Sequence, residues 1–412
     1  MTPRLSVSLP LWQDRDPLDA LAVAAAAADL GYDRLWIGEM ATFDAFALAT
    51  AVGRTPGDLP LCVGPLAVAI RTPATIAMGA ASVAALTGRP VAVALGTSSP
   101  VVVTDWHGRE RTSTAAHLED TALIVRDLLA GAKVDYKGHC ERIRGFHLRL
   151  PAPRPVATPA EDDFAVGGAP GEHAAGALME PVASVRGPAR PGSVDDPARA
   201  GGSDRLPAVS ISTRSSAGPT GTSSAAPPDP SDADGGRTLR GEIAVAAFGA
   251  RALSVGARVA DRVVLNLVTP AQVARCVSAV REFAAAAGRP APAIAVWVTA
   301  GVDPTPEMLA TLRRGVVGYL RAPGYAAMFT EAGFGDVVRL AQGGAHPREV
   351  LAAVPDELPA AIGMLGDAGA VRVRLAEYRA AGADEVVVVP VTSAEDPAGR
   401  HTLRTVRGFD RD

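Results

Sequence analysis

Along this chain, short apolar runs typical of strands alternate with longer stretches whose apolar residues repeat with the period of a helix. Four short apolar runs, each bounded by polar or turn-forming residues, predict strands at residues 4–12, 34–40, 59–66 and 90–96. The stretches between and after them are Ala-rich or amphipathic and predict helices over Pro17–Leu30, Ala45–Val52, a segment from Pro73 onward, and His117–Ala130. Asp16-Pro17 and Thr72-Pro73 support two of these helix starts, because each places a capping side chain before a proline.

The same alternation returns in the second half of the chain. Strands are predicted at residues 242–249, 263–268, 293–302 and 384–393. Helical segments are predicted after the fifth strand, over Pro270–Gly288, Pro306–Arg321 and Tyr325–Val354, and at the C-terminus. Four strands before residue 150 and four after residue 240 indicate an α/β fold, a (β/α)8 TIM barrel, with a six-stranded doubly wound sheet as the alternative.

The two halves are separated by a segment of different composition. Residues 155–240 are rich in Pro, Gly, Ser and Ala, and such a sequence buries too little apolar surface to offset its chain entropy. We therefore expect three parts: residues 1–154 as the first half of the barrel, 155–240 as a long disordered insertion, and 241–412 as the second half.

Composition and charge exclude several classes of partner. The net charge of −4 and the pI near 6.0 give no general attraction to nucleic acid or to anionic membranes. No apolar run is long enough for a signal peptide or a membrane span, so we expect a cytoplasmic protein that acts on a small-molecule substrate. The cysteines have no metal-binding spacing, no metal site is expected, and each is expected to be a small buried hydrophobe: Cys62, Cys140 and Cys276.

Two predicted strands end in small or hydroxyl residues. In a parallel α/β fold the C-terminal ends of the strands share one face, which is where ligands bind. Small residues leave backbone N–H groups and open space, which suits a flat or phosphorylated cofactor. The residues concerned are Gly64, Gly96, Thr97, Ser98 and Ser99.

Four sequence blocks together resemble the luciferase-like superfamily, and within it the branch that uses the deazaflavin coenzyme F420, such as methylenetetrahydromethanopterin reductase. They are TAVG at residues 50–53, the block GPLAVAIRTP from Gly64, the pair TGR and ALGTSS before Pro100, and AAFGARALSVGARVAD followed by VVLNLVTP. The resemblance implies a (β/α)8 barrel with the cofactor at its C-terminal mouth. It further implies an oxidoreductase that transfers a hydride between F420 and a small organic substrate, and it makes a homodimer an expected assembly.

The resemblance also assigns cofactor contacts. It places a cis peptide bond at the end of the third strand, at Gly64-Pro65, against the face of the ring, and we expect Leu66 to adjoin it. Cis bonds are a minority even before proline, so a trans bond is the alternative. At the start of the helix after the fifth strand, Gly249, Ala250 and Arg251 are expected to bind the cofactor phosphate, because free amides and the helix dipole favour an anion there.

Catalytic roles are expected for Glu39 and Ser99. Glu39 ends the second strand, where it could accept hydrogen bonds from the cofactor or relay a proton, or could instead cap the next helix. Met40 stands where sugar-phosphate enzymes of the family have a histidine, which argues against that activity. Ser99, with Thr97 and Ser98, stands where relatives carry a glutamate, so hydroxyls would orient the ligand.

Two other functions stay open at this point. An FMN-dependent luciferase-like monooxygenase would need the same barrel and phosphate site, and also a partner flavin reductase. A non-catalytic barrel that binds a flavin or deazaflavin belongs to a different class. Three further side chains could reach the mouth or pair locally: Arg71, Arg321 and Tyr325.

Overall fold

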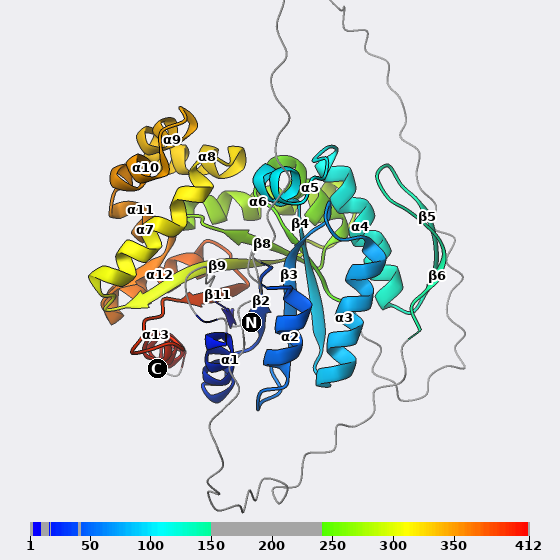
Figure 1. Cartoon of the computed structure of the whole chain (residues 1–412), viewed down its shortest axis with the longest axis horizontal. Helices are drawn as coiled ribbons and strands as arrows, with labels where there is room; N and C mark the ends of the chain where they lie inside the picture. The colour runs from blue at the N-terminus through cyan, green and yellow to red at the C-terminus, as the bar shows by residue number, and fades with distance from the viewer. Residues whose placement is uncertain (1–2, 10–15, 17, 40–42, 150–240, 411–412) are drawn as a thin grey trace, which may run out of the picture. The chain divides into compact units, whose positions relative to one another are not determined.

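Eight parallel strands close into a barrel, as the sequence predicted (Figure 1). The computed structural model describes residues 3–9, 16, 18–39, 43–149 and 241–410. The barrel strands follow one another in chain order, and β11 closes the ring by pairing with β1. They are β1 (Arg4–Ser8), β2 (Leu35–Ile37), β3 (Leu61–Ala67), β4 (Val91–Gly96), β7 (Ile243–Ala246), β8 (Arg262–Asn266), β9 (Ala293–Val302) and β11 (Glu385–Pro390). The closed ring excludes the six-stranded sheet.

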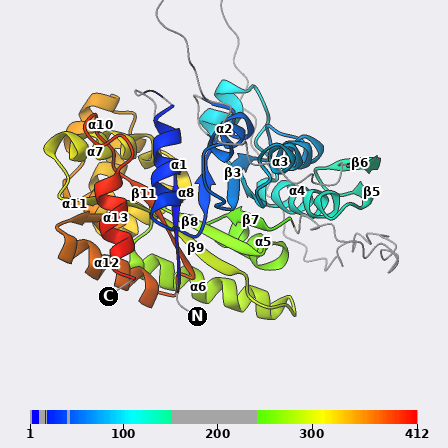
Figure 2. The same cartoon turned by 90° about the horizontal axis from the view of Figure 1, so that it is seen from below.

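Helices surround the barrel on its outside (Figures 1 and 2). Those that follow barrel strands are α1 (Asp19–Asp29), α2 (Ala45–Gly53), α3 (Pro73–Thr87), α4 (Thr114–Leu129), α5 (Ala250–Val259), α6 (Pro270–Ala286) and α13 (Arg400–Gly408). A further group between β9 and β11 consists of α7 (Pro306–Leu320), α8 (Pro323–Phe329), α9 (Gly335–Gln342), α10 (Pro347–Ala353), α11 (Glu357–Ile362) and α12 (Ala368–Ala380). The helices α7 to α11 share a second apolar core of their own.

Alternation along each strand divides the barrel core into two layers. Leu35 and Ile37 on β2 face the surrounding helices, whereas Trp36 between them joins the residues inside the barrel. Most interior positions carry small side chains, and two tryptophans fill the remaining space. Trp36 and Trp297 meet edge to face, with ring centroids 5.7 Å apart.

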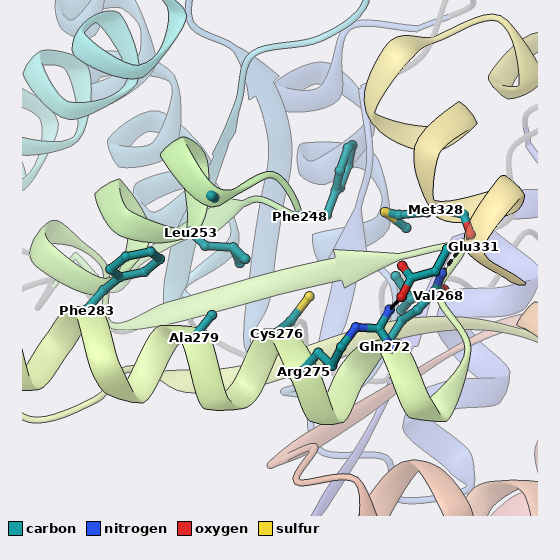
Figure 3. A pocket seen from close by; sticks show the side chains of 11 residues that line it. Phe248, Leu253, Val268, Gln272, Arg275, Cys276, Ala279, Phe283, Met328 and Glu331 are labelled. Carbon is teal, nitrogen blue, oxygen red and sulfur yellow. Dashed lines mark hydrogen bonds and ion pairs between the residues drawn. The ribbon is translucent and has the colours of Figure 1, made fainter.

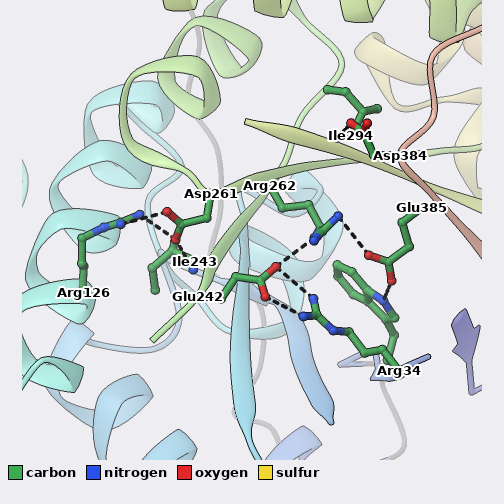
Figure 4. Close-up of polar contacts among 10 residues, drawn as sticks. Arg34, Arg126, Glu242, Ile243, Asp261, Arg262, Ile294, Asp384 and Glu385 are labelled. Carbon is green, nitrogen blue, oxygen red and sulfur yellow. Dashed lines mark hydrogen bonds and ion pairs between the residues drawn. The ribbon is translucent and has the colours of Figure 1, made fainter. Parts of the chain in front are cut away.

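A buried ion-pair network fills the end of the barrel where the strands begin (Figure 4). Glu242 accepts from Arg34 Nη1 and from Arg262 Nε, both at 2.9 Å. Arg262 Nη1 also lies 3.0 Å from Glu385, which accepts the indole N–H of Trp36 at 2.8 Å. Burial acts to raise the pKa of Glu242, but hydrogen bonds and charge from Arg34 and Arg262 outweigh it and lower the pKa to about 2. This end is therefore plugged, and the mouth at the strand C-termini is where a ligand can enter.

Some elements differ from the sequence predictions. Helix α1 begins at Asp19, and α4 begins three residues before the expected His117. The predicted Tyr325–Val354 segment is three helices joined by a π-helical turn and loops. Cys140 is exposed, so its prediction as a buried hydrophobe was wrong.

Several elements were not predicted at all. They are α11, α12, a short strand β10 (Met364–Gly366) that pairs with β9, a π-helical turn Val101–Trp106, and the antiparallel hairpin β5 (Lys133–Lys137) and β6 (Arg142–His147). The hairpin lies beside α4, whose Asp120 accepts from the Tyr136 hydroxyl at 2.7 Å and from the amides of Cys140 and Glu141.

The expected insertion at 155–240, and Met40, lie outside the described residues. Within the ranges that the structure describes, no helix has the length and apolar character needed to cross a membrane.

Candidate functional site

The ends of β3, β4 and β7 come together at the mouth of the barrel. The Gly64-Pro65 bond is cis, which confirms the prediction at this position. Gly64 has a φ of +120°, and a Cβ there would lie 2.2 Å from the carbonyl oxygen of Ala94, so only glycine fits. A Cβ added to Gly96 would lie 3.2 Å from Pro65 and 3.6 Å from Ala246. Small residues of three strands thus form one surface. The side chain of Leu66, by contrast, is buried in the core around the barrel, so only its backbone is left for a ligand.

The hydroxyl-rich loop after β4 is held by an arginine that the sequence analysis missed. Arg111 donates from Nε to the Ser98 carbonyl at 3.1 Å and from Nη2 to the Thr97 hydroxyl at 3.3 Å. Ser98 has a left-handed φ of 54°. The Ser99 hydroxyl accepts from the Val102 amide at 3.3 Å and so begins the π-helical turn that follows. These bonds hold the loop in place. The Ser99 hydroxyl already binds a backbone amide of the same loop, which leaves it partly occupied.

Left-handed backbone recurs at the ends of other barrel strands. Leu267 directly follows β8 with a φ of 56°, and Asp303 directly follows β9 with a φ of 49°. A bulky residue such as leucine rarely adopts this conformation. Backbone of this kind concentrates at functional sites. Leu267, Asp303 and Ser98 all follow the C-terminal ends of barrel strands, so they indicate the same end of the barrel as the functional one.

Glu39 is held by Arg71 rather than lying free in the mouth. The Nε atom of Arg71 donates to both carboxylate oxygens of Glu39, at 3.0 and 3.1 Å, and its Nη2 atom pairs with Glu39 and with Asp44. Glu39 and Arg71 are only 18% and 21% exposed, so solvent screens this pair weakly. Asp44 caps α2 through the amides of Phe46 and Ala47. Burial acts to raise the pKa of Asp44, but hydrogen bonds from Arg71 and these amides lower it.

The predicted phosphate residues lie at the start of α5. Gly249 is its capping residue, no side chain caps the helix, and a Cβ at Gly249 would meet no atom within 4 Å. The amides of the first turn have no partner within the helix, and they lie at the positive end of its dipole. Arg251 is exposed beside them. The donors and the open space fit an anion such as a phosphate monoester.

Tyr325 connects the helical group to two strand ends. Its ring packs on Phe248, with centroids 4.4 Å apart, and its hydroxyl interacts with the side chain of Asn266, the last residue of β8. Burial raises the pKa of Tyr325, which keeps the hydroxyl protonated. Arg321 instead donates to the carbonyls of Ala341 and Ala345, so it stabilises the helical group locally.

Three comparisons with known proteins bear on these observations. A family model described as luciferase-like monooxygenase matches residues 7–184 and 218–385. No curated protein matches the sequence. Among solved structures, coenzyme F420-dependent tetrahydromethanopterin reductase from Methanopyrus kandleri is 14% identical with a TM-score of 0.64, over 98% of this chain and 97% of that chain.

Two further structures share the fold. An F420-dependent secondary alcohol dehydrogenase in complex with an F420-acetone adduct is 14% identical with a TM-score of 0.64, over 100% of both chains. The oxygenating constituent of 3,6-diketocamphane monooxygenase from the CAM plasmid of Pseudomonas putida, in complex with FMN, is 12% identical with a TM-score of 0.55, over 98% of this chain and 97% of that chain. Because the family model matches most of the sequence and the barrel agrees with it, the chain belongs to the luciferase-like monooxygenase family, whose members are oxidoreductases and monooxygenases.

Proposed function

We propose that this enzyme transfers a hydride between coenzyme F420 and a small organic substrate at the mouth of the barrel. The observation that carries the proposal is the pairing of an uncapped α5 N-terminus at Gly249 with the small-residue surface of Gly64-Pro65, Gly96 and Ala246. The first suits a phosphate, and the second would present only small side chains to a flat ring. Both F420-dependent structures, with TM-scores of 0.64, support the choice of F420 over FMN, whose example has a TM-score of 0.55.

The residues at the mouth fit such a cofactor. Gly249, Ala250 and Arg251 would hold its phosphate, and Gly64, Pro65, the Leu66 backbone and Gly96 would face its ring. When bound, the deazaflavin supplies the hydride chemistry. The task of the chain is to orient the ring and substrate and to limit access of water.

Protons would be handled by Glu39 and by hydroxyls of the loop after β4. Arg71 fixes the Glu39 carboxylate at the end of β2, and one of its oxygens can accept a further hydrogen bond, because a carboxylate has about four acceptor positions. Thr97, Ser98 and Ser99 would orient the polar group of the substrate. Arg111 keeps this loop in place. We extend the proposal to a homodimer in the cytoplasm.

An FMN-dependent monooxygenase is the second candidate, and the family description and the FMN-bound relative support it. The two functions differ in their need for oxygen. A hydride transferase oxidises reduced F420 with an organic acceptor under strictly anaerobic conditions. A monooxygenase requires oxygen and reduced FMN from a partner reductase.

The test is a screen of full-length protein against aldehydes, ketones and enones. The 420 nm absorbance of the cofactor would be followed without oxygen, starting from reduced F420. We expect at least one acceptor to restore the absorbance in proportion to product formed. Turnover seen only with reduced FMN and oxygen would establish the monooxygenase instead. Tight F420 binding without turnover of any acceptor would support the non-catalytic barrel.

A further inference from the structure

A cavity lies outside the barrel wall, between α5 and α6, and shares Ala250 with the proposed phosphate site (Figure 3). Its volume is about 260 Å³. Its walls come from α5, α6, the ends of β7 and β8, and the segment where α8 passes into a π-helical turn, Thr330–Phe334. The lining is mostly apolar, and its largest members are Phe248, Leu253, Phe283 and Met328.

The polar groups around this cavity already have partners. Gln272 donates from its side-chain amide to the Met328 carbonyl at 2.7 Å and accepts from the Thr269 amide at 2.9 Å. Arg275 forms an ion pair with Glu331 at the rim, where both side chains are about half exposed. The pair has no net charge, so the cavity favours neither an anion nor a cation.

The thiol of Cys276 also lines the cavity. Burial raises its pKa, so the thiol is neutral and acts as a small apolar surface. The opposite wall includes Glu331 in the π-helical turn, whose Gly333 has a φ of 99°. Interruptions of this kind are frequent at functional sites.

We propose that this cavity binds a neutral aromatic molecule of about the size of indole. An apolar cavity of about 150 Å³ is enough to bind benzene, so 260 Å³ accommodates a somewhat larger ring system. Phe248 and Phe283 line the cavity with aromatic carbon, and Gln272 and Arg275 already have partners, so the lining favours an aromatic ligand over a polar one.

Cys276 provides a reporter for this site in the full-length protein. In a Cys140→Ser background the exposed thiol is removed and Cys62 is fully buried, so iodoacetamide modifies Cys276 in preference. The alkylation rate at Cys276, located by mass spectrometry, is measured against indole concentration. We expect saturable protection that reaches about tenfold when indole is at ten times its Kd. Glycerol at the same concentrations should give none.

Two variants distinguish the effect of filling the cavity from the effect of adding a phenylalanine anywhere on α6. Ala279→Phe places a ring inside the cavity, and Ala285→Phe places the same ring on the exposed face of the same helix. Saturable protection should be lost in the first variant and kept in the second. Absence of saturable protection in the Cys140→Ser protein at millimolar indole overturns the proposal, and that result does not depend on how Ala279→Phe folds. Equal protection in a folded Ala279→Phe protein would also overturn it. Because the alkylation assay contains no cofactor, neither outcome decides the proposed function at the mouth.

Discussion

The guanidinium of Arg71 and the carboxylate of Glu39 form a two-point contact at the mouth, although 32 residues separate them in the sequence. Arg71 also reaches Asp44, the cap of α2, and its guanidinium lies 5.2 Å from the ring centre of Phe46. The second strand end therefore carries a fixed carboxylate whose position depends on the start of the next helix.

The first prediction concerns the charge of Glu39. Glu39→Gln keeps the size of the side chain but removes the carboxylate, so hydride transfer should slow by about 10²-fold, the lower end of general acid–base contributions. The Kd for the cofactor should change little. Asp44→Asn is the matched control, because it removes the other carboxylate that Arg71 contacts. The Asn amide oxygen can still accept from the amides of Phe46 and Ala47, so the cap of α2 and the rate should both change little. Equal rates in Glu39→Gln and wild type would remove the assigned role.

The second prediction concerns the loop after β4. Arg111→Ala removes two hydrogen bonds to Thr97 and Ser98, so the loop should become more mobile and the KM for substrate should rise several-fold. The loss of stability should be about 1 kcal/mol. Arg109→Ala, at an exposed position of the same loop, should change neither quantity. Steady-state kinetics and urea unfolding measure both effects, and identical KM values for the two variants would contradict the role of Arg111.

The third prediction concerns acid stability. The folded-state pKa of Glu242 is about 2, below its ordinary value of about 4.3, so its stabilisation is fully present above the ordinary value. That contribution, roughly 3 kcal/mol, should be lost as the pH falls from about 4.5 to 2. In Glu242→Gln the free energy of unfolding should be lower at pH 7 by about 3–5 kcal/mol, because Arg34 and Arg262 lose a buried partner.

The pH dependence provides the check on this account. Urea unfolding between pH 7 and pH 2 should show a smaller acid-induced loss in Glu242→Gln than in wild type. Glu282→Gln, a substitution on the exposed face of α6, should keep the wild-type slope. Parallel curves for wild type and Glu242→Gln would show that the network does not govern acid unfolding.

The fourth prediction concerns the phosphate. Gly249 has a φ of −86°, which is near the range of proline, so Gly249→Pro removes one amide with little change of the helix start. It should abolish measurable cofactor binding. Arg251→Ala should raise the Kd by about 5- to 150-fold, which corresponds to about 1–3 kcal/mol. Arg281→Ala, which removes an exposed cation from α6, should leave the Kd unchanged. Fluorescence titration measures all three, and unchanged binding in the α5 variants would place the phosphate elsewhere.

Strand and helix patterns predicted a barrel, with a six-stranded sheet as the alternative that only the closed ring excludes. Most of the eight strands are short apolar runs, and Thr72 caps α3 by accepting from the Thr75 amide, as its position before Pro73 predicted. The helix α12 had a readable signal as well, since Val371, Leu375 and Tyr378 repeat at helical spacing and are buried. The hairpin carries alternating Val134 and Tyr136, and this pattern was also overlooked.

The contacts of the site could not be predicted from sequence. The bonds from Arg111 to Thr97 and from Arg71 to Glu39 join segments that only the closed barrel brings together. Periodicity identifies which face of an element is buried, but it carries no information on which polar side chains meet across loops. For the same reason, the burial of Leu66 in the outer core was not anticipated when it was placed beside the cofactor ring.

The central claim is that the mouth binds F420, and a competitive titration tests it most directly. The full-length protein would be titrated with oxidised F420 and, separately, with FMN, with binding followed by the fluorescence of each cofactor. We predict a Kd for F420 at least tenfold lower than that for FMN, and loss of F420 binding in Gly249→Pro. Tighter binding of FMN, or F420 binding that Gly249→Pro leaves intact, would contradict the account.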